Sequence, residues 1–363
     1  MTLLPATARA AALACFGLLL TACGTESDKK LQDYAQVIPP ANLSVVVSNA
    51  VTGDPIAGAE ARFDGDTATT AADGKALFSD IAAITQGLVH IKAAGFTRTS
   101  QFTTTAHGTT AKVSARLLPV GATTTINPAA GGGLSQAGTP AQATIPANVL
   151  VDAAGTPVTA TTTLELTTIN LNNNISSVPG AFATAAGEPL EGFGTIQLIG
   201  TAGGADVSVA TGSTITIRVP YTSRSTATPP ATMGMIHFDD TTGHWVPSTT
   251  TATLQGTAPN QYYEATVDQL GTWMAGKIIS PSVTLSGCVV NEGSNTPAAN
   301  VRIQAEGITY SGLSYALTDA AGKFSVKVKS EAASQVIVNG VFGSQCDQRD
   351  QTDLEVHVVF QTA

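Results

Sequence analysis

A strand-and-turn pattern occurs twice in this chain, once near each end, and it restricts the fold strongly. In the later copy Phe324, Val326 and Val328 alternate strictly with polar residues, which predicts a strand with one buried face. Residues 318–324 (TDAAGKF) lead into that strand, and residues 70–76 (TAADGKA) hold the matching place in the earlier copy. Asp and Gly before such a strand indicate a tight turn between two strands. We therefore expect two similar all-β modules.

Composition favours the same fold class along the whole chain. Ala, Thr, Gly and Val dominate, only 12% of residues are charged, and there are 35 Gly and 18 Pro. Thr and Val favour strands, whereas Gly and Pro supply turns. The net charge of −9 argues against binding to nucleic acid or directly to anionic lipid headgroups. We predict an all-β protein that needs no cofactor.

The N-terminal segment predicts export. Residues 10–22 (AAALACFGLLLTA) are apolar and follow a single early positive charge, Arg9. Thirteen residues at ~1.5 Å rise cannot cross a hydrocarbon core of ~30 Å, so this segment is too short for a membrane span. Its length and position are typical of the apolar region of a signal peptide.

Residues 20–23 (LTAC) resemble the lipobox of bacterial lipoproteins. In that family a peptidase cuts before the Cys, whose thiol receives a diacylglycerol and whose amine receives a third acyl chain. The resemblance implies a signal peptide over residues 1–22, lipidation of Cys23 and permanent membrane anchoring. Gly24 in place of Asp implies the outer membrane and leaves open which face of it. An ordinary secretory signal that ends in Cys is the alternative interpretation.

Two cysteines remain in the body of the mature chain, because Cys15 leaves with the signal peptide and Cys23 is lipidated. An even pair in an exported protein indicates a disulfide, here between Cys288 and Cys346. It would close a loop of 58 residues (346 − 288). The chain-entropy model values such a loop at ~4 kcal/mol of stability. Two buried free thiols are the alternative.

The mature chain divides into a tether and three β segments. Residues 23–40 are polar after the lipidated Cys and end in two prolines, which is typical of a flexible tether with a stiff end. Residues 41–120 and 281–363 contain the two copies of the repeat, and residues 121–280 have a different pattern of short strands. We predict three tandem β-sandwich domains after the signal peptide and tether.

Both copies resemble the carboxypeptidase regulatory-like domain, a seven-strand sandwich related to prealbumin and grouped with carbohydrate-binding-like folds. The family pattern is a strand, then G-x-P-hydrophobic-x-G-A-x-V, then T-D-x-x-G-x-F. The first copy keeps residues 55–59 (PIAGA), whereas the last has Asn300 where Gly is usual. Residues 121–280 resemble an Ig-like sandwich of bacterial surface lipoproteins and of cartilage intermediate layer-like proteins. The predicted disulfide would tie the first strand of the last copy to the segment near Gln345.

Domains related to the central one cleave themselves at a His-Phe-Ser-like strand. The equivalent segment here is 267–273 (VDQLGTW), in which Gln269 replaces the base and Gly271 cannot supply a hydroxyl nucleophile. Self-cleavage is therefore not expected, and no other catalytic constellation stands out. We predict that the protein is not an enzyme.

His237 and Asp239 are the candidates for a metal site, since residues two apart share one face of a strand. The alternative is a hairpin with an Asp-Thr-Thr-Gly turn and Trp245 in the core. Third and fourth ligands are not spaced as a structural zinc site requires, so we favour the hairpin and predict no metal.

The candidates for a sugar-stacking face are Tyr262, Tyr263, Tyr310 and Tyr315. The alternative is that these rings anchor the cores, because aromatics make up only 5% of the residues. The sugar-binding interpretation rests largely on fold analogy.

The sequence favours a lipid-anchored, non-enzymatic protein of the cell envelope that acts as a structural or adhesive β-sandwich module. A carbohydrate-binding lipoprotein of a polysaccharide-handling system is the second hypothesis. An enzyme with a metal-assisted site at His237 and Asp239 is the third. The expected partners are a membrane, reached through the N-terminal lipid, and a protein or glycan ligand.

Overall fold

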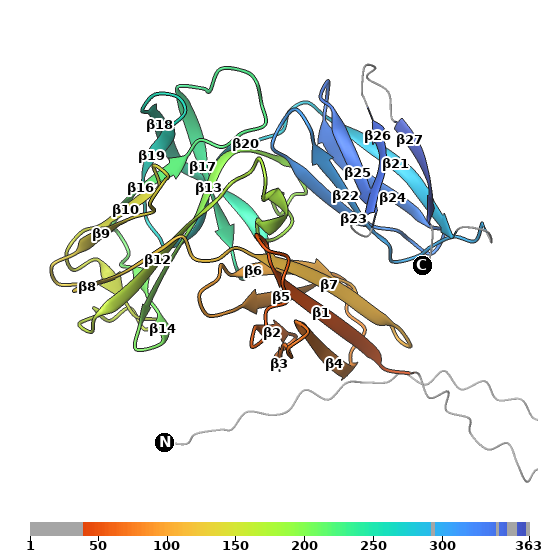
Figure 1. Ribbon diagram of the computed structural model, residues 1–363, viewed down its shortest axis with the longest axis horizontal. Helices are drawn as coiled ribbons and strands as arrows, with labels where there is room; N and C mark the ends of the chain where they lie inside the picture. Colours follow the sequence, from red (N-terminus) through yellow and green to blue (C-terminus); the bar gives the residue numbers. More distant parts are fainter. Residues whose placement is uncertain (1–38, 292–294, 339–340, 347–353, 361–363) are drawn as a thin grey trace, which may run out of the picture. The chain divides into compact units, whose positions relative to one another are not determined.

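Strands make up nearly all of the regular structure, as the sequence predicts. The computed structural model describes residues 39–291, 295–338, 341–346 and 354–360, the last two by their backbone only. Within these ranges it contains 27 strands and one 3-10 helix, η1 (Ile175–Ser177) (Figure 1). The predicted all-β class is confirmed. In the same part of the chain, no helix has the length and hydrophobicity of a membrane span.

Three of the predictions concern residues outside this description. They are the signal peptide over residues 1–22, the lipid on Cys23 and the tether, of which only Pro39 and Pro40 are described. All three stay predictions.

The first module consists of two facing sheets. Its strands are β1 (Ala41–Asn49), β2 (Glu60–Phe63), β3 (Asp66–Thr69), β4 (Lys75–Ile81), β5 (Gly87–Lys92), β6 (Thr99–Thr103) and β7 (Thr110–Leu117). One sheet has the order β4-β1-β7 and the other β3-β2-β5-β6. Alternate residues of β1, such as Val45 and Val47, are fully buried, and they meet Phe63 and Val89 of the other sheet in one core. Period-two patterning therefore produces this sandwich directly.

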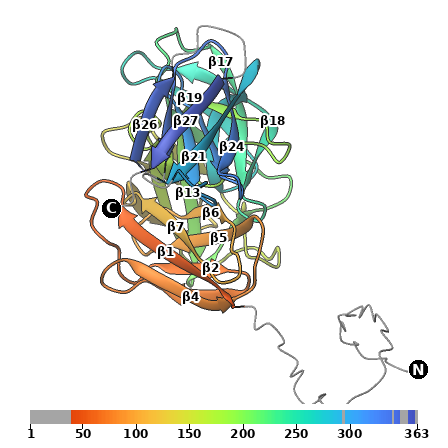
Figure 2. The ribbon, with the colours of Figure 1, turned by 90° about the vertical axis from the view of Figure 1, so that its right-hand side faces the viewer.

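The last module repeats this topology. Its strands are β21 (Ser282–Asn291), β22 (Arg302–Gly307), β23 (Leu313–Leu317), β24 (Lys323–Lys329), β25 (Ser334–Val338), β26 (Val341–Cys346) and β27 (Leu354–Phe360). The sheets have the orders β24-β21-β27 and β23-β22-β25-β26 (Figure 2). As β1 is antiparallel to β4 and parallel to β7, so β21 is antiparallel to β24 and parallel to β27. The sequence repeat is thus a repeat of strand order and direction.

A buried threonine explains why both copies keep the Thr before the Asp-x-x-Gly turn. In each copy the Thr hydroxyl donates to a backbone carbonyl and accepts from a backbone N–H, so it joins the turn to the preceding segment. The partners are Ile56 (2.6 Å) and Ala59 (2.9 Å) for Thr70, and Ala298 (2.6 Å) and Val301 (2.9 Å) for Thr318.

We expect Thr70→Val and Thr318→Val each to lower the free energy of unfolding by about 1–3 kcal/mol, because each leaves a buried N–H and carbonyl without a partner. Urea denaturation of each variant measures the loss. Thr67→Val is the control, because Thr67 is exposed on β3, and we expect a change within about 0.5 kcal/mol. Equal effects of Thr67→Val and Thr70→Val would contradict the assignment.

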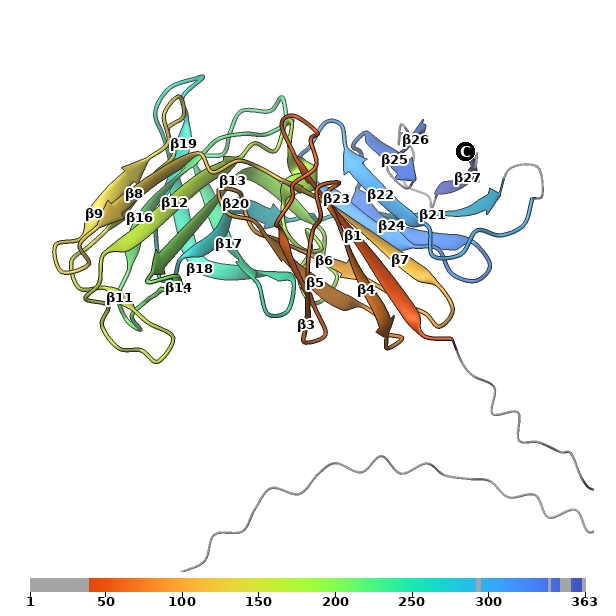
Figure 3. The same ribbon diagram turned by 60° about the horizontal axis from the view of Figure 1, so that its bottom comes forward.

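The central module is built from one sheet of eleven strands that folds over itself. It follows the order β8-β12-β13-β20-β17-β18-β19-β16-β10-β9, and β14 pairs with β13 (Figure 3). The strands are β8 (Ala122–Ile126), β9 (Gly132–Ser135), β10 (Gln142–Ile145), β11 (Leu150–Val151), β12 (Thr162–Ile169), β13 (Leu190–Ala202), β14 (Ala205–Asp206), β15 (Ser208–Val209), β16 (Ile215–Pro220), β17 (Thr232–Asp239), β18 (His244–Gln255), β19 (Tyr262–Val267) and β20 (Gly271–Ile278).

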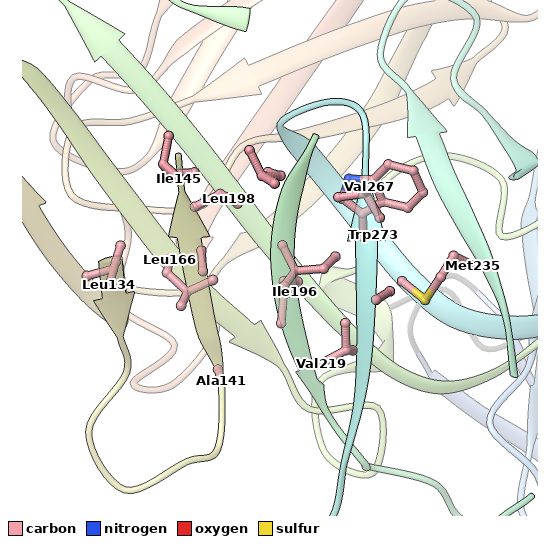
Figure 4. Close-up of a cluster of buried hydrophobic side chains, with 14 of the residues drawn as sticks. Leu134, Ala141, Ile145, Leu166, Ile196, Leu198, Val219, Met235, Val267 and Trp273 are labelled. Carbon is pink, nitrogen blue, oxygen red and sulfur yellow. The ribbon is translucent and has the colours of Figure 1, made fainter. Parts of the chain in front are cut away.

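The core of the central module lies inside the folded sheet. Figure 4 shows Leu134 and Ile145, from β9 and β10 at one end of the sheet, in the same cluster as Leu166, Ile196 and Trp273 from β12, β13 and β20. All five side chains are buried. The hydrophobic alternation of the sequence is satisfied by folding one sheet, so a second sheet is not required.

A second hydrophobic cluster joins the three modules, and we call it the junction cluster. It contains Ala50 and Leu118 from the ends of the first module, Leu313 from the last, and Phe238 and Trp245 from the central one. Its other buried members are Ile169, Leu171, Ile175, Val178, Phe182, Leu190, Ile236 and Met274. The chain from Pro39 onward accordingly forms one compact unit.

Cys288 and Cys346 lie in different sheets of the last module, on β21 and at the end of β26. Leu285 and Val289 are buried, so the alternation along β21 places Cys288 on the outer face of its sheet. The predicted disulfide would require the end of β26 to reach that outer face. The side chain of Cys346 is outside the described part, so the disulfide stays a prediction.

Candidate functional site

A cavity of about 450 Å³ opens where the pairing of β13 is interrupted. β13 pairs with β20 as far as Leu198 and Gly271, and with β14 from Thr201 and Asp206 onward. The backbone between these two pairings, at residues 199–200, lines the cavity. The ionisable side chains around it are Arg98, Asp206, His237, Asp240 and Asp268. This cavity is the candidate functional site.

Arg98 reaches the cavity from the first module and is fixed there by the central module. Its guanidinium donates to both oxygens of Asp206, at 2.6 and 2.8 Å. Its backbone N–H donates to Gln197 Oε1 at 2.7 Å, and Gln197 Nε2 donates to its carbonyl at 2.9 Å. The hydrogen bonds from Arg98 hold the pKa of Asp206 below its usual range. Arg98 therefore connects the first and central modules beside the cavity.

Asp240 carries an unusual pKa, although the residue as a whole is exposed. Loss of water around the carboxyl group raises its pKa to about 6, and the negative charges of Asp239 and Asp206 add to the effect. The positive charge of Arg98 acts in the opposite direction and does not cancel the rise. Ionised Asp240 thus costs stability in the folded protein.

This shift predicts how Asp240→Asn responds to pH. The pKa of Asp240 is raised from 3.8 in the unfolded chain to about 6 in the folded one, so the carboxyl loses its proton first in the unfolded chain. Stability associated with this group falls as the pH rises from about 4 to about 6. We expect Asp240→Asn to have a higher urea midpoint than the parent at about pH 7.5 and an equal midpoint below about pH 4.

Asp239→Asn is the control for this prediction, because the pKa of Asp239 is shifted in the opposite direction. Burial acts to raise the pKa of Asp239, but hydrogen bonds from Thr242 and Thr241 outweigh it, and the net pKa is lowered. We expect Asp239→Asn to lower the urea midpoint at neutral pH. A gain from Asp240→Asn that is the same at every pH would show that the charge of Asp240 is not its cause.

His237 and Asp239, the predicted metal candidates, have different partners. The His237 ring packs on Trp273 with centroids 5.0 Å apart and hydrogen-bonds to the backbone of Leu270, and burial lowers its pKa. The Asp239 carboxylate instead accepts from the Thr241 N–H at 2.9 Å in the turn. The structure, as far as it is described, contains no group of three His, Cys, Asp or Glu side chains that could hold a metal.

The hairpin interpretation of this segment is confirmed. β17 and β18 pair in antiparallel fashion, with Phe238 opposite Trp245 and Asp239 opposite His244. Trp245 is buried, and its Nε1 donates to the carbonyl of Pro179 at 3.1 Å.

The segment that replaces a self-cleavage site has a packing role. The Gln269 carbonyl accepts from Trp273 Nε1 at 3.0 Å. Gly271 has φ +114°, and a Cβ added there would lie 3.0 Å from His237 Nε2. Gly is thus required by the backbone and by the neighbouring ring, and no nucleophile stands at this position.

Two of the four predicted sugar-binding tyrosines belong to the interior. Tyr263 and Tyr310 are buried, and their hydroxyls hydrogen-bond to the Pro230 carbonyl at 2.9 Å and to Ser334 Oγ at 3.1 Å. Neither ring offers a face to a ligand, so the core interpretation applies to both. The sequence could not separate them from Tyr262 and Tyr315, because ring orientation depends on the register of β19 for Tyr263 and on the path of the β22–β23 loop for Tyr310.

The other two tyrosines are half-buried and lie under arginine side chains. The guanidinium of Arg218 lies 4.9 Å from the Tyr262 ring centroid, and that of Arg302 lies 4.2 Å from the Tyr315 centroid. Tyr262 is on β19 of the central module and Tyr315 on β23 of the last. They are the remaining residues for the glycan-binding hypothesis, which stays a prediction.

Sequence reasoning missed the buried ion pairs between the central and last modules. Arg224 Nη1 lies 2.5 Å from Glu306 Oε1, with the two side chains only 17% and 10% exposed. Glu191, 2% exposed, binds Lys329 at 2.8 Å and lies 3.4 Å from Lys277. The sequence did contain a sign that Glu191 is buried and paired. It is a charged residue inside the apolar run LEGFG (190–194), in a chain with few charges.

Comparisons with known proteins show distant likeness to solved β-structures. No family model and no curated protein matches the chain. The Bacillus anthracis TIE protein is 10% identical with a TM-score of 0.20, over 88% of this chain and 50% of that one. BcpA, the major pilin subunit of Bacillus cereus, is 10% identical with a TM-score of 0.19, over 88% and 98% of the chains.

The major pilin SpaD from Corynebacterium diphtheriae is similar at 8% identity and a TM-score of 0.19, over 89% of this chain and 96% of that one. This chain spans half the length of the TIE protein chain. Scores of this size carry no argument about function, which has to come from the residues themselves.

Proposed function

We propose that this protein is a non-enzymatic structural module of the cell envelope, anchored in the outer membrane by a lipid on Cys23. We further assign its first and last modules to the carboxypeptidase regulatory-like type, on their shared turn motif. The observation that carries the proposal is the set of ion pairs that join the modules. Arg98, Arg224 and Glu191 each bind an oppositely charged partner from another module.

The use of charge in this chain supports a structural role. Loss of one partner of a buried ion pair strongly destabilises the protein, because the other charge is then buried without a counter-ion. The pair Arg224–Glu306 is of this kind, whereas Arg98, which lines the candidate cavity, forms a more exposed pair with Asp206. The junction cluster adds a shared apolar core to these pairs. Such a body resists bending between its modules, as an adhesive or structural element of an envelope requires.

Metabolic labelling with an alkyne fatty acid tests the anchor. The parent protein should be labelled and recovered with the outer membrane, whereas Cys23→Ser should be unlabelled and keep its signal peptide. Cys15→Ser is the matched control, because Cys15 lies in the predicted signal peptide and its loss should leave labelling unchanged. Equal labelling of the parent and Cys23→Ser would overturn the anchor.

The non-enzymatic part has its own test. The purified mature protein should show no turnover of peptide, ester or glycan substrates above a heat-denatured sample. Turnover that Asp240→Asn or His237→Ala abolishes would instead assign a reaction to the cavity.

A further inference from the structure

The outer face of the sheet β4-β1-β7 (Figure 3) carries three basic residues, Lys75, Lys112 and Arg116. Strand register places Leu77, Ser44 and Lys112 in one row across the three strands. Arg116 lies four residues further along β7, on the same face, opposite Ser48 of β1. Lys112, Arg116 and Leu77 are exposed, and their alternation partners form the core, so all three belong to the outer face.

The cations of this face are only partly neutralised. Lys75, the third cation, lies 3.3 Å from Asp73. Within the described residues, Lys112 and Arg116 have no carboxylate within ion-pair distance, and Arg116 donates to the Ala50 carbonyl at 2.9 Å. Asp80 at the end of β4 is the other acidic residue of this sheet. The face therefore carries an excess of positive charge in a chain whose net charge is −9.

An exposed leucine lies among these cations. Leu77 is 61% exposed on β4. It lies two residues from Lys75 and at the opposite end of its row from Lys112. An apolar side chain flanked by Lys and Arg suits the boundary between headgroups and acyl chains, where long basic side chains reach phosphates and the apolar one is partly withdrawn from water.

The chain enters the fold at the central strand of this sheet, β1. Seventeen residues (24–40) separate Cys23 from the start of β1 at Ala41. A flexible segment of that length has an average end-to-end distance of ~20–25 Å. β1, the central strand of the sheet, has nine residues, and at ~3.3 Å per residue it is ~30 Å long. The length of the sheet is thus similar to the distance that a chain of seventeen residues spans on average.

We propose that the outer face of β4-β1-β7 rests on the anionic lipid headgroups of the anchoring membrane. The proposal rests on the proposed lipid anchor, which would hold this face at a millimolar effective concentration over the bilayer. The negative net charge does not oppose it strongly, since charges beyond a Debye length of ~10 Å are screened. Each basic residue at an anionic surface raises the partition coefficient by about fivefold.

Vesicle co-sedimentation of the mature chain carrying Cys23→Ser tests this face without any contribution from acyl chains. We expect stronger binding to phosphatidylcholine vesicles with about 30% phosphatidylglycerol than to vesicles of phosphatidylcholine alone, and loss of the difference at about 0.5 M salt. The double variant Lys112→Glu/Arg116→Glu should bind the anionic vesicles at least about tenfold more weakly.

The matched control is Lys323→Glu/Lys327→Glu, which makes the same change in net charge on the equivalent sheet of the last module. Both residues are exposed, and we expect binding within about twofold of the parent. Near-ultraviolet circular dichroism confirms that each variant is folded. Equal binding to both kinds of vesicle, or equal losses in the two double variants, would overturn the proposal. Neither result bears on lipidation, which the labelling experiment measures separately.

Discussion

Phe238→Ala is expected to lower the free energy of unfolding by about 3–5 kcal/mol, because truncation of a large buried aromatic side chain creates a cavity. Phe238 is fully buried on β17, and its ring lies 5.3 Å from that of Trp245. Gly180 packs directly against the ring, and a Cβ there would collide with it. Because backbone packs this closely around the ring, we expect the cavity left by its removal to persist. Urea denaturation followed by tryptophan fluorescence measures the loss.

Val246→Ala is the matched control for Phe238→Ala. Val246 lies on the neighbouring strand β18 and is 47% exposed, so its truncation should change stability by about 0.5 kcal/mol or less. A loss below about 1 kcal/mol for Phe238→Ala would show that the junction cluster is loosely packed.

Arg224→Ala is expected to lower the free energy of unfolding by about 3–5 kcal/mol, because it leaves the carboxylate of Glu306 buried without its cation. Arg224 Nη1 also donates to the Gly307 carbonyl at 2.6 Å, and its Nη2 donates to the Asn172 carbonyl at 3.0 Å. One side chain thus joins the central and last modules through an ion pair and backbone contacts. Chemical denaturation at neutral pH gives the size of the effect.

Two variants separate this pair from ordinary surface charge. Arg224→Ala/Glu306→Gln should be less destabilised than Arg224→Ala alone, since the unpaired charge is then absent. Arg62→Ala removes an exposed pair with Glu60 and should cost less than about 1 kcal/mol. If Arg62→Ala and Arg224→Ala had equal effects, burial of the Arg224 pair would not matter.

Local patterns predicted the strands and the repeat, because both depend on neighbouring residues. The alternation of Phe324, Val326 and Val328 specifies a buried face without knowledge of the partner strand. The Thr-Asp-x-x-Gly turn likewise contains its own hydrogen bonds, with the Asp319 carboxylate accepting from the Lys323 N–H at 2.8 Å. Each of these features lies within a few residues of sequence.

The junctions could not be predicted, because their partners lie far apart in the chain. Arg98 and Asp206 are 108 positions apart, and Arg302 reaches Gln101 across 201 positions. Nothing in the local sequence around Arg98 distinguishes it from an exposed arginine. The continuity of the sheet in the central module could not be predicted for a similar reason, since alternation specifies a buried face but not which strand covers it.

The candidate site was only partly accessible from the sequence. Ligand chemistry drew attention to His237 and Asp240, which do line the cavity, but it could not predict the raised pKa of Asp240, which comes from surroundings that include Asp206 on another strand. The tyrosines were correctly seen as either ligands or core anchors. Only the structure assigned Tyr263, on β19, and Tyr310, in the loop between β22 and β23, to the core.

The most direct test of a structural role is whether the three modules open together. Hydrogen exchange at increasing urea gives the free energy of opening for β1 in the first module, β20 in the central one and β21 in the last. Because the junction cluster and the buried ion pairs join these modules, we expect the three free energies to converge on one global value. Separate values, with β1 or β21 opening several kcal/mol below β20, would mean that the modules are independent domains on flexible joints, contrary to the proposed role.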